Sequence, residues 1–168
     1  MIGVYIHVPF CRTLCPYCDF NRVRIDGAPP DAFVDALVRE IDAFDARREA
    51  ETVFLGGGTP SLLAPGQLDR ILEAVRRRFD LKAPEITLEA NPDDVTETLA
   101  DAWRATGVNR VSLGVQSFDD AALRYLGRRH DAETARLASR TVAARFANWS
   151  MDIIYGAHLP ASWPATLT

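Results

Sequence analysis

The sequence predicts an α/β fold, a partial (βα) barrel of parallel strands that is truncated after about five strands. Short apolar segments alternate with amphipathic segments of ten or more residues, which is typical of parallel strands joined by right-handed crossovers. Unusual residues follow successive strands: cysteines after the first, glycines after the second, Glu89 at the end of the third and Gln116 after the fourth. A barrel brings such strand ends to one face, whereas a doubly wound sheet would place its glycines after the first strand.

Apolar segments predict the strands of this barrel. The first is interpreted as a buried strand that Pro9 ends, and a long loop over residues 9–30 follows it. The second stops at Gly56 and the third at Asn91-Pro92, residues that favour turns. The expected strands cover residues 2–8, 52–55, 85–90, 110–115 and 150–154.

Helical spacing of apolar residues predicts the connections between the strands. The second helix has the clearest stripe, formed by Leu68, Ile71, Leu72 and Val75. The first helix has a corresponding stripe of Phe33, Leu37, Ile41 and Phe44. Thr96 is a candidate N-cap of the third helix and Gly107 its expected stop. The expected helices cover residues 31–47, 66–79, 96–106, 119–126 and 132–146, and residues 160–168 resemble the opening of another.

Composition indicates an ordinary globular domain, with 48% hydrophobic and 25% charged residues. The formal net charge of −4 argues against a nucleic-acid partner, and the three arginines at 76–78 are expected to face water. The sequence contains neither an 18-residue apolar stretch nor a signal peptide, so we expect no transmembrane segment and a cytoplasmic location. Lys82, the only lysine, is expected between a helix and a strand, which leaves no candidate Schiff-base or phosphate-loop lysine.

All three cysteines, Cys11, Cys15 and Cys18, lie within eight residues. Three thiols cannot pair off evenly, and clustered cysteines in a reducing compartment indicate metal binding or an iron–sulfur cluster. Three thiolates would leave one iron of a four-iron cluster open to another ligand. The competing interpretation is a structural zinc site with His7 or Asp19 as the fourth ligand, but zinc sites usually use two separated pairs of ligands. His7 lies in an apolar strand and is expected to be a core histidine.

Two further strand ends carry unusual residues. Residues 56–58, three glycines before Thr59, are expected to let a small ligand approach the backbone closely, although a plain strand-to-helix turn is the alternative. Glu89 ends an otherwise apolar strand, where a charge is costly unless it is paired or bound. A solvent-exposed glutamate at a strand end fits the sequence equally well. Residues 128–130, Arg-Arg-His, by themselves predict an exposed basic loop.

Several motifs together resemble a known family. The spacing C-x3-C-x2-C, with Tyr17 just before the last cysteine, resembles the signature of radical S-adenosylmethionine (SAM) proteins. The string YIHVPFC is similar to the oxygen-independent coproporphyrinogen III oxidase family within that superfamily. Further family motifs follow in order: GGGTPS at 56–61, LEANP at 88–92, GVQSF at 114–118 and DIIYG at 152–156. The resemblance covers nearly all 168 residues but only the N-terminal part of the family's length, so we expect an N-terminal portion of a radical SAM core domain, with the remaining strands and a C-terminal domain absent.

This resemblance implies both cofactors and the residues that bind them. It implies that Cys11, Cys15 and Cys18 bind a [4Fe–4S] cluster, and that SAM chelates the open iron. Reduction of the cluster would then cleave a C–S bond of SAM to give a 5′-deoxyadenosyl radical, with the cofactors supplying the reactivity. No residue of the chain is predicted to be catalytic in its own right. The implied SAM contacts are Tyr5, Tyr17, Gly57, Gly58, Thr59, Glu89, Gln116, Arg128 and Asp152.

Two branches of the family differ just after the last cysteine. The oxidases carry Gly-Cys there, whereas this chain has Asp19-Phe20-Asn21, which resembles the branch of HemW-like haem chaperones. Members of that branch bind a cluster, SAM and haem, and deliver haem to respiratory proteins. The resemblance therefore favours a haem chaperone, with coproporphyrinogen oxidase as the alternative and a structural zinc module as a distant third. The implied partners are haem or a porphyrin, a haem-acceptor protein and an electron donor.

The C-terminal residues depart from the family pattern. Members continue Tyr-Gly-Leu-Pro-Gly-Gln, whereas residues 155–161 read YGAHLPA. The fifth strand would then lie at an open edge, which favours association. We therefore expect a fragment, a truncated gene product or half of a split protein. His158 is a conceivable haem ligand, but a lone loop histidine is more often incidental.

Overall fold

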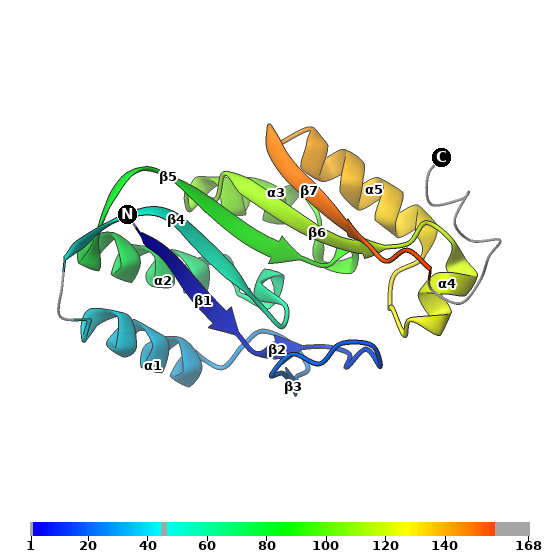
Figure 1. The fold of residues 1–168 in the computed structure, drawn as a ribbon, viewed down its shortest axis with the longest axis horizontal. Helices are drawn as coiled ribbons and strands as arrows, with labels where there is room; N and C mark the ends of the chain where they lie inside the picture. The colour runs from blue at the N-terminus through cyan, green and yellow to red at the C-terminus, as the bar shows by residue number, and fades with distance from the viewer. Residues whose placement is uncertain (1, 45–46, 157–168) are drawn as a thin grey trace.

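The computed structural model describes residues 2–44 and 47–156. Its centre is a five-stranded parallel sheet whose strand order, β1-β4-β5-β6-β7, follows the chain without reversal (Figure 1). A doubly wound sheet would reverse direction at a switch point, so this order confirms the partial-barrel prediction. The strands are β1 (Ile2–Val8), β4 (Arg48–Gly57), β5 (Phe79–Ala90), β6 (Arg110–Gln116) and β7 (Asn148–Ile153).

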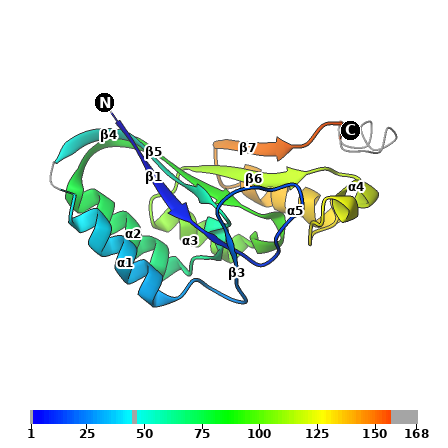
Figure 2. The same cartoon turned by 60° about the horizontal axis from the view of Figure 1, so that its bottom comes forward.

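The longer helices cover one face of this sheet (Figure 2). Right-handed crossovers between strands in sequential order place every connecting helix on the same side, and neighbouring helices pack α1 on α2, α2 on α3 and α3 on α5. None of the helices found in 2–44 and 47–156 is both long and apolar enough to cross a bilayer. The helices are α1 (Asp31–Asp42), α2 (Pro65–Arg78), α3 (Glu97–Ala105), α4 (Asp120–Tyr125) and α5 (Ala132–Ala143), with 3-10 turns η1 (Pro60–Leu62) and η2 (Pro92–Asp94).

The core lies between the sheet and the helices, and α2 contributes most regularly to it. The predicted stripe is confirmed, because its four residues are at most 1% exposed. The first helix is less well predicted: α1 ends at Asp42, so Phe44 lies beyond it and is exposed, whereas Val34, outside the predicted stripe, is fully buried.

The predicted ends of α3 are also confirmed. The Thr96 hydroxyl accepts a hydrogen bond from the Leu99 N–H at 3.1 Å, which satisfies a free donor of the first turn. Gly107 follows the helix with φ at 101°, a left-handed conformation that glycine adopts without strain.

Strands β4 and β5 begin earlier than predicted. Their first residues, Arg48–Ala50 and Phe79–Leu81, pair with each other beyond the predicted strands 52–55 and 85–90. The sequence gives no signal for this extension, because it contains charged residues, and β5 also contains Pro84. Charged residues and proline are both depleted in strands. Lys82 therefore lies within β5, not between a helix and a strand, and its Nζ is 3.4 Å from the Glu49 carboxylate.

The first strand and the loop after it also differ from expectation. Strand β1 is an edge strand in which only Ile6 and Val8 are buried, so the prediction of a buried strand was wrong for its first half. The loop 9–30 contains a short parallel pair, β2 (Phe10–Cys11) and β3 (Val23–Arg24), that the sequence did not predict. At the opposite edge lies β7, and residues 157–168, with His158 and the expected last helix, fall outside the described residues.

Candidate cofactor-binding site

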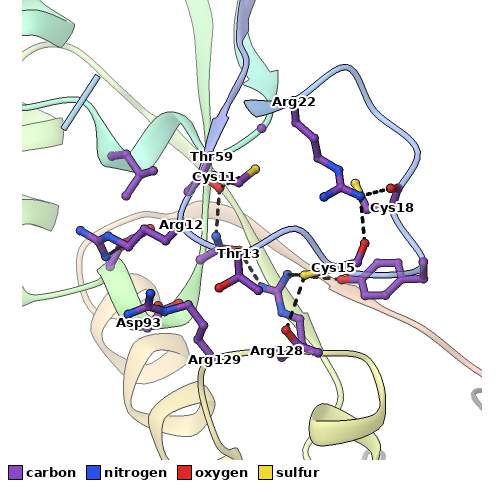
Figure 3. A pocket seen from close by; sticks show the side chains of 16 residues that line it. Cys11, Arg12, Thr13, Cys15, Cys18, Arg22, Thr59, Asp93, Arg128 and Arg129 are labelled. Atoms are coloured by element: carbon purple, nitrogen blue, oxygen red, sulfur yellow. Dashed lines mark hydrogen bonds and ion pairs between the residues drawn. The ribbon is translucent and has the colours of Figure 1, made fainter. Parts of the chain in front are cut away.

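The carboxyl ends of the strands surround two adjoining pockets. The first, here called the cysteine pocket, is lined by all three cysteines together with Arg12, Arg22 and Arg128 (Figure 3). The second, here called the strand-end pocket, is lined by residues from the ends of β4, β5, β6 and β7. The two pockets share a wall made of Tyr17, Cys18, Gly58, Thr59, Asn91 and Arg128. A ligand in the strand-end pocket would therefore lie directly beside the cysteines.

The three cysteines are free thiols that face the same pocket. Cys11 in β2 and Cys15 are buried, whereas Cys18 is partly exposed. Burial raises the pKa of the Cys11 thiol, while a hydrogen bond from Thr59 and the nearby Arg22 charge oppose that rise. A thiolate at Cys11 therefore needs a positively charged partner such as a metal.

A continuous hydrogen-bond network supports the cysteine pocket from the strand ends. The Thr59 hydroxyl donates to Cys11 Sγ at 3.5 Å and accepts from the Asn91 amide at 3.2 Å. Arg128 Nη2 donates to Asn91 Oδ1 at 2.6 Å, and Nη1 lies 3.3 Å from the Tyr17 hydroxyl and 3.9 Å from Cys15 Sγ. Because each group is held by the next, the network fixes the shared wall of the two pockets.

The cysteine loop is also tied to η2. Arg12 forms an ion pair with the buried carboxylate of Asp94, which also accepts a hydrogen bond from the Ser61 hydroxyl at 2.7 Å. Burial raises the pKa of Asp94, and the Ser61 hydroxyl and Arg12 oppose the rise. The pair therefore fastens the start of the loop to the turn after β5.

The glycines at the end of β4 are required by the protein's own chain. Gly57 has φ at 106°, and a Cβ there would lie 2.3 Å from His7 Nδ1. A Cβ on Gly58 would lie 2.7 Å from the carbonyl oxygens of both Val8 and Phe10. These glycines still line the strand-end pocket, but the space beside their Cα atoms is filled by β1 and the start of the cysteine loop. Close approach of the chain is therefore one reason for glycine at both positions, and close approach of a ligand stays a prediction.

Glu89 is partly buried and interacts with the same segment. Its Oε2 accepts a hydrogen bond from the Gly57 N–H at 3.1 Å. Burial is the main cause that raises the pKa of Glu89, and the Asp152 charge adds to it, whereas the Gly57 N–H and His7 oppose it. The interpretation of Glu89 as a simple exposed strand-end residue is therefore wrong.

We expect Glu89→Gln to stabilise the cofactor-free protein at neutral pH. A carboxyl group whose pKa is raised by folding contributes stability below its ordinary pKa and loses that contribution as the pH rises through the raised value. Glutamine does not titrate and can still accept the Gly57 hydrogen bond. Urea unfolding of both proteins from acidic to neutral pH would measure the difference, which should shrink as the pH falls. A difference that does not change with pH would contradict this expectation.

Most of the implied SAM contacts come together in the strand-end pocket. Gln116 at the end of β6 has φ at 67°, a left-handed conformation that is strained for a residue with a Cβ and is common at functional sites. Asp152 of β7 accepts a hydrogen bond from the Ser112 hydroxyl at 3.3 Å. Eight of the nine implied contacts line this pocket: Tyr17, Gly57, Gly58, Thr59, Glu89, Gln116, Arg128 and Asp152.

Tyr5 does not line either pocket. Its side chain is 59% exposed, stacks on Phe54 and lies with its hydroxyl 3.2 Å from His7 Nδ1. His7 in turn is only partly buried, and its Nε2 lies 2.8 Å from the Asn21 carbonyl oxygen of the cysteine loop. The prediction of a core histidine was therefore wrong, because β1 is an edge strand.

The basic loop prediction for residues 128–130 holds only for Arg129. The Arg129 side chain is 51% exposed and pairs with Asp93, whereas Arg128 is part of the pocket wall. His130 is buried, with Nε2 at 3.0 Å from the Val115 carbonyl oxygen, and burial lowers its pKa. The three neighbours thus have three different environments.

The donor set fits an iron–sulfur cluster better than a single metal ion. Within residues 2–44 and 47–156, no three His, Cys, Asp or Glu side chains are arranged to hold one ion. In a cubane each cysteine binds a different iron, so its ligands do not converge on a single point. The zinc alternative lacks the required grouping in this part of the chain.

Asn91 and Arg22 are the main site residues that the sequence did not single out. Asn91 connects Thr59 to Arg128, and Arg22 contacts the backbone of the cysteine loop. Asn91 follows directly on Glu89-Ala90, so its place after a strand could have identified it. Arg22 lies in the loop among several arginines, and only the folded structure distinguishes it from them.

Comparisons with known proteins show the family to which the chain belongs. The family model described as the Radical SAM superfamily matches residues 5–158. Two curated proteins named Heme chaperone HemW are each 40% identical to this chain. The match to the protein from Lactococcus lactis covers 91% of this chain and 41% of the relative, and the match to the protein from Escherichia coli covers 92% of this chain and 43% of the relative. The solved structure of coproporphyrinogen III oxidase (HemN) from Escherichia coli, described as a radical SAM enzyme, superposes with a TM-score of 0.88 and 32% identity, over 98% of this chain and 40% of that one. The chain thus spans about two fifths of the length of these relatives.

Proposed function

This chain belongs to the radical SAM superfamily, and on that premise we propose that Cys11, Cys15 and Cys18 bind a [4Fe–4S] cluster whose fourth iron takes SAM. The observation that carries the proposal is that three free cysteines line one pocket, which shares a wall with the strand-end pocket. A cluster with only three protein ligands needs such a neighbouring space for its remaining ligand.

The strand-end pocket has the chemistry to hold SAM. The carboxylates of Glu89 and Asp152 can accept hydrogen bonds from amino or hydroxyl groups, and the Arg128 guanidinium suits a carboxylate. Tyr17 offers a partly exposed ring at the shared wall. Bound together, the two cofactors supply one-electron chemistry at the sulfonium, while these residues position SAM and exclude water.

Anaerobic reconstitution with iron and sulfide tests this proposal. We expect the protein to bind a four-iron cluster whose EPR spectrum in the reduced state changes when SAM is added. Cys11→Ser should lose most of the iron, because serine is a poor ligand for a soft metal site. An EPR spectrum that SAM leaves unchanged would overturn the proposed open iron.

For the activity, we propose that the whole protein is a haem chaperone. Curated relatives of that name share about 40% identity with this chain, and Asp19-Phe20-Asn21 has the form that distinguishes the chaperone branch. Its partners would be haem, a haem-acceptor protein and an electron donor, in the cytoplasm. Titration of the reconstituted protein with haem should give a saturable Soret band.

A second candidate is oxygen-independent coproporphyrinogen III oxidase, favoured by the close superposition with that enzyme. An anaerobic assay for vinyl-group formation from coproporphyrinogen separates the two candidates. Turnover without stable haem binding would overturn the chaperone proposal.

A further inference from the structure

We infer that Arg22 is a positioning residue for the iron–sulfur cluster, which holds the cysteine loop by its backbone and directs N–H groups and a positive charge at the cluster. The inference rests on the proposed cluster site. Arg22 lines the cysteine pocket, but it is not among the residues implied to contact the cluster or SAM.

The first observation is a clamp on the loop. Arg22 Nη2 donates to the carbonyl oxygen of Cys15 at 2.9 Å and also to the carbonyl oxygen of Cys18 (Figure 3). One side chain therefore fixes the backbone at two of the three cysteines. Both bonds come from one nitrogen, so what a lysine at this position would lack is the remaining donors of the guanidinium, Nε and Nη1.

The second observation is unused hydrogen-bonding capacity. Nε and Nη1 of Arg22 are buried and have no hydrogen-bond partner among residues 2–44 and 47–156. Leaving such donors unpaired in a folded protein is costly, and most buried polar groups have a partner. Because Arg22 lines the cysteine pocket together with all three cysteines, cluster or thiolate sulfurs could accept from these free N–H groups.

The third observation is uncompensated charge. Arg12 and Arg129, which line the same pocket, are paired with Asp94 and Asp93. Among the ion pairs formed within 2–44 and 47–156, none includes Arg22 or Arg128, and Arg22 donates to backbone carbonyls. A net positive charge therefore remains beside the cysteines.

Both properties should affect the reduction potential of the cluster. Hydrogen bonds to the sulfurs and local charge are among the factors that set the potential of an iron–sulfur cluster. Donors and a positive charge stabilise the more negative, reduced state, so Arg22 makes the cluster easier to reduce.

The test is a redox titration of the reconstituted protein, followed by EPR, for wild type, Arg22→Gln and Arg22→Lys. At the wild-type midpoint potential, the ratio of reduced to oxidised cluster should fall about tenfold in Arg22→Gln, equivalent to about 59 mV for one electron. Arg22→Lys keeps the charge but not the Nε and Nη1 donors, and its midpoint potential should lie between those of the other two proteins. Arg24→Gln is the matched control, because Arg24 is exposed in the same loop and its substitution removes the same charge.

The outcomes separate this inference from the cluster proposal. Failure of wild type to bind iron would overturn the proposed function itself. Arg22→Gln with normal iron content and an unchanged potential would overturn only the role of Arg22, as would an equal shift in Arg24→Gln. If Arg22→Gln loses the cluster while Arg22→Lys retains it at a lowered potential, the inference is supported. Loss from both would overturn it in favour of a role in loop folding alone.

Discussion

Alanine at Gly58 is expected to abolish cluster binding and to destabilise the cofactor-free protein by roughly 3 kcal/mol or more, the range of severe steric substitutions. A Cβ there would lie 2.7 Å from the carbonyl oxygens of Val8 and Phe10 and 2.8 Å from the Phe10 nitrogen. All three contacts are with backbone, so no side-chain rotation can relieve them. Relief requires β1 and β2 to move apart from β4, and Cys11 moves with β2.

Gly66→Ala is the matched control for this substitution. Gly66 lies in the first turn of α2, and no atom lies within 4 Å of a Cβ built on it. Alanine should stabilise the protein there by about 0.5–1 kcal/mol, because it favours helix and restricts the unfolded chain. Urea unfolding and the iron content after reconstitution measure both effects. Similar stabilities and iron contents for Gly58→Ala and Gly66→Ala would contradict the packing argument.

The fold class could be predicted because it depends on local periodicity. The α2 stripe of Leu68, Ile71, Leu72 and Val75 repeats at helical spacing, and the structure buries every member. The order of the strands followed from the alternation of strands and helices together with the unusual residues at successive strand ends, which favoured a barrel over a doubly wound sheet. Both features depend on residues that are close in the sequence, so they could be predicted without tertiary information.

The ends of the elements could not be predicted equally well. The first residues of β4 and β5 are strands because they pair with each other, and the polar residues in them give no apolar signal. Strand β1 looked buried because its residues are apolar, but its position at the sheet edge exposes Tyr5. In both cases the outcome depends on the neighbouring strand, which is distant in the sequence.

The candidate site, too, could be predicted only in part. Motifs identified most residues of the strand-end pocket, because they follow successive strands that end on one face. The motifs did not reveal why Gly57 and Gly58 are needed, because only the folded chain shows that β1 and the cysteine loop fill the adjacent space. They also did not reveal Arg22, or the role of Asn91 in connecting Thr59 to Arg128, because these roles come from contacts across the loop and between strands.

Arg128 joins the two pockets more directly than any residue that the motifs emphasise. Its guanidinium holds Asn91 Oδ1 at 2.6 Å and the Gly114 carbonyl oxygen at 2.7 Å through Nη2, while Nη1 reaches Tyr17. Its Nε is buried without a partner. A ligand carboxylate at the shared wall would find a donor that is already fixed in place, which reduces the entropy cost of binding.

Arg128→Lys should therefore weaken SAM binding about tenfold or more, roughly 1.4 kcal/mol, while leaving most of the iron in place. A lysine cannot hold Asn91, Gly114 and Tyr17 at the same time, because its single ammonium lacks the planar fork. Arg129→Lys is the matched control: Arg129 is exposed, and its ion pair with Asp93 is of the surface kind that contributes about 1 kcal/mol or less. Calorimetric titration of the reconstituted variants with SAM, with iron analysis alongside, measures both quantities. If Arg128→Lys lost iron and SAM affinity together, Arg128 would support the cysteine loop rather than SAM. Equal SAM affinities for the two variants would show that the shared wall does not bind the ligand.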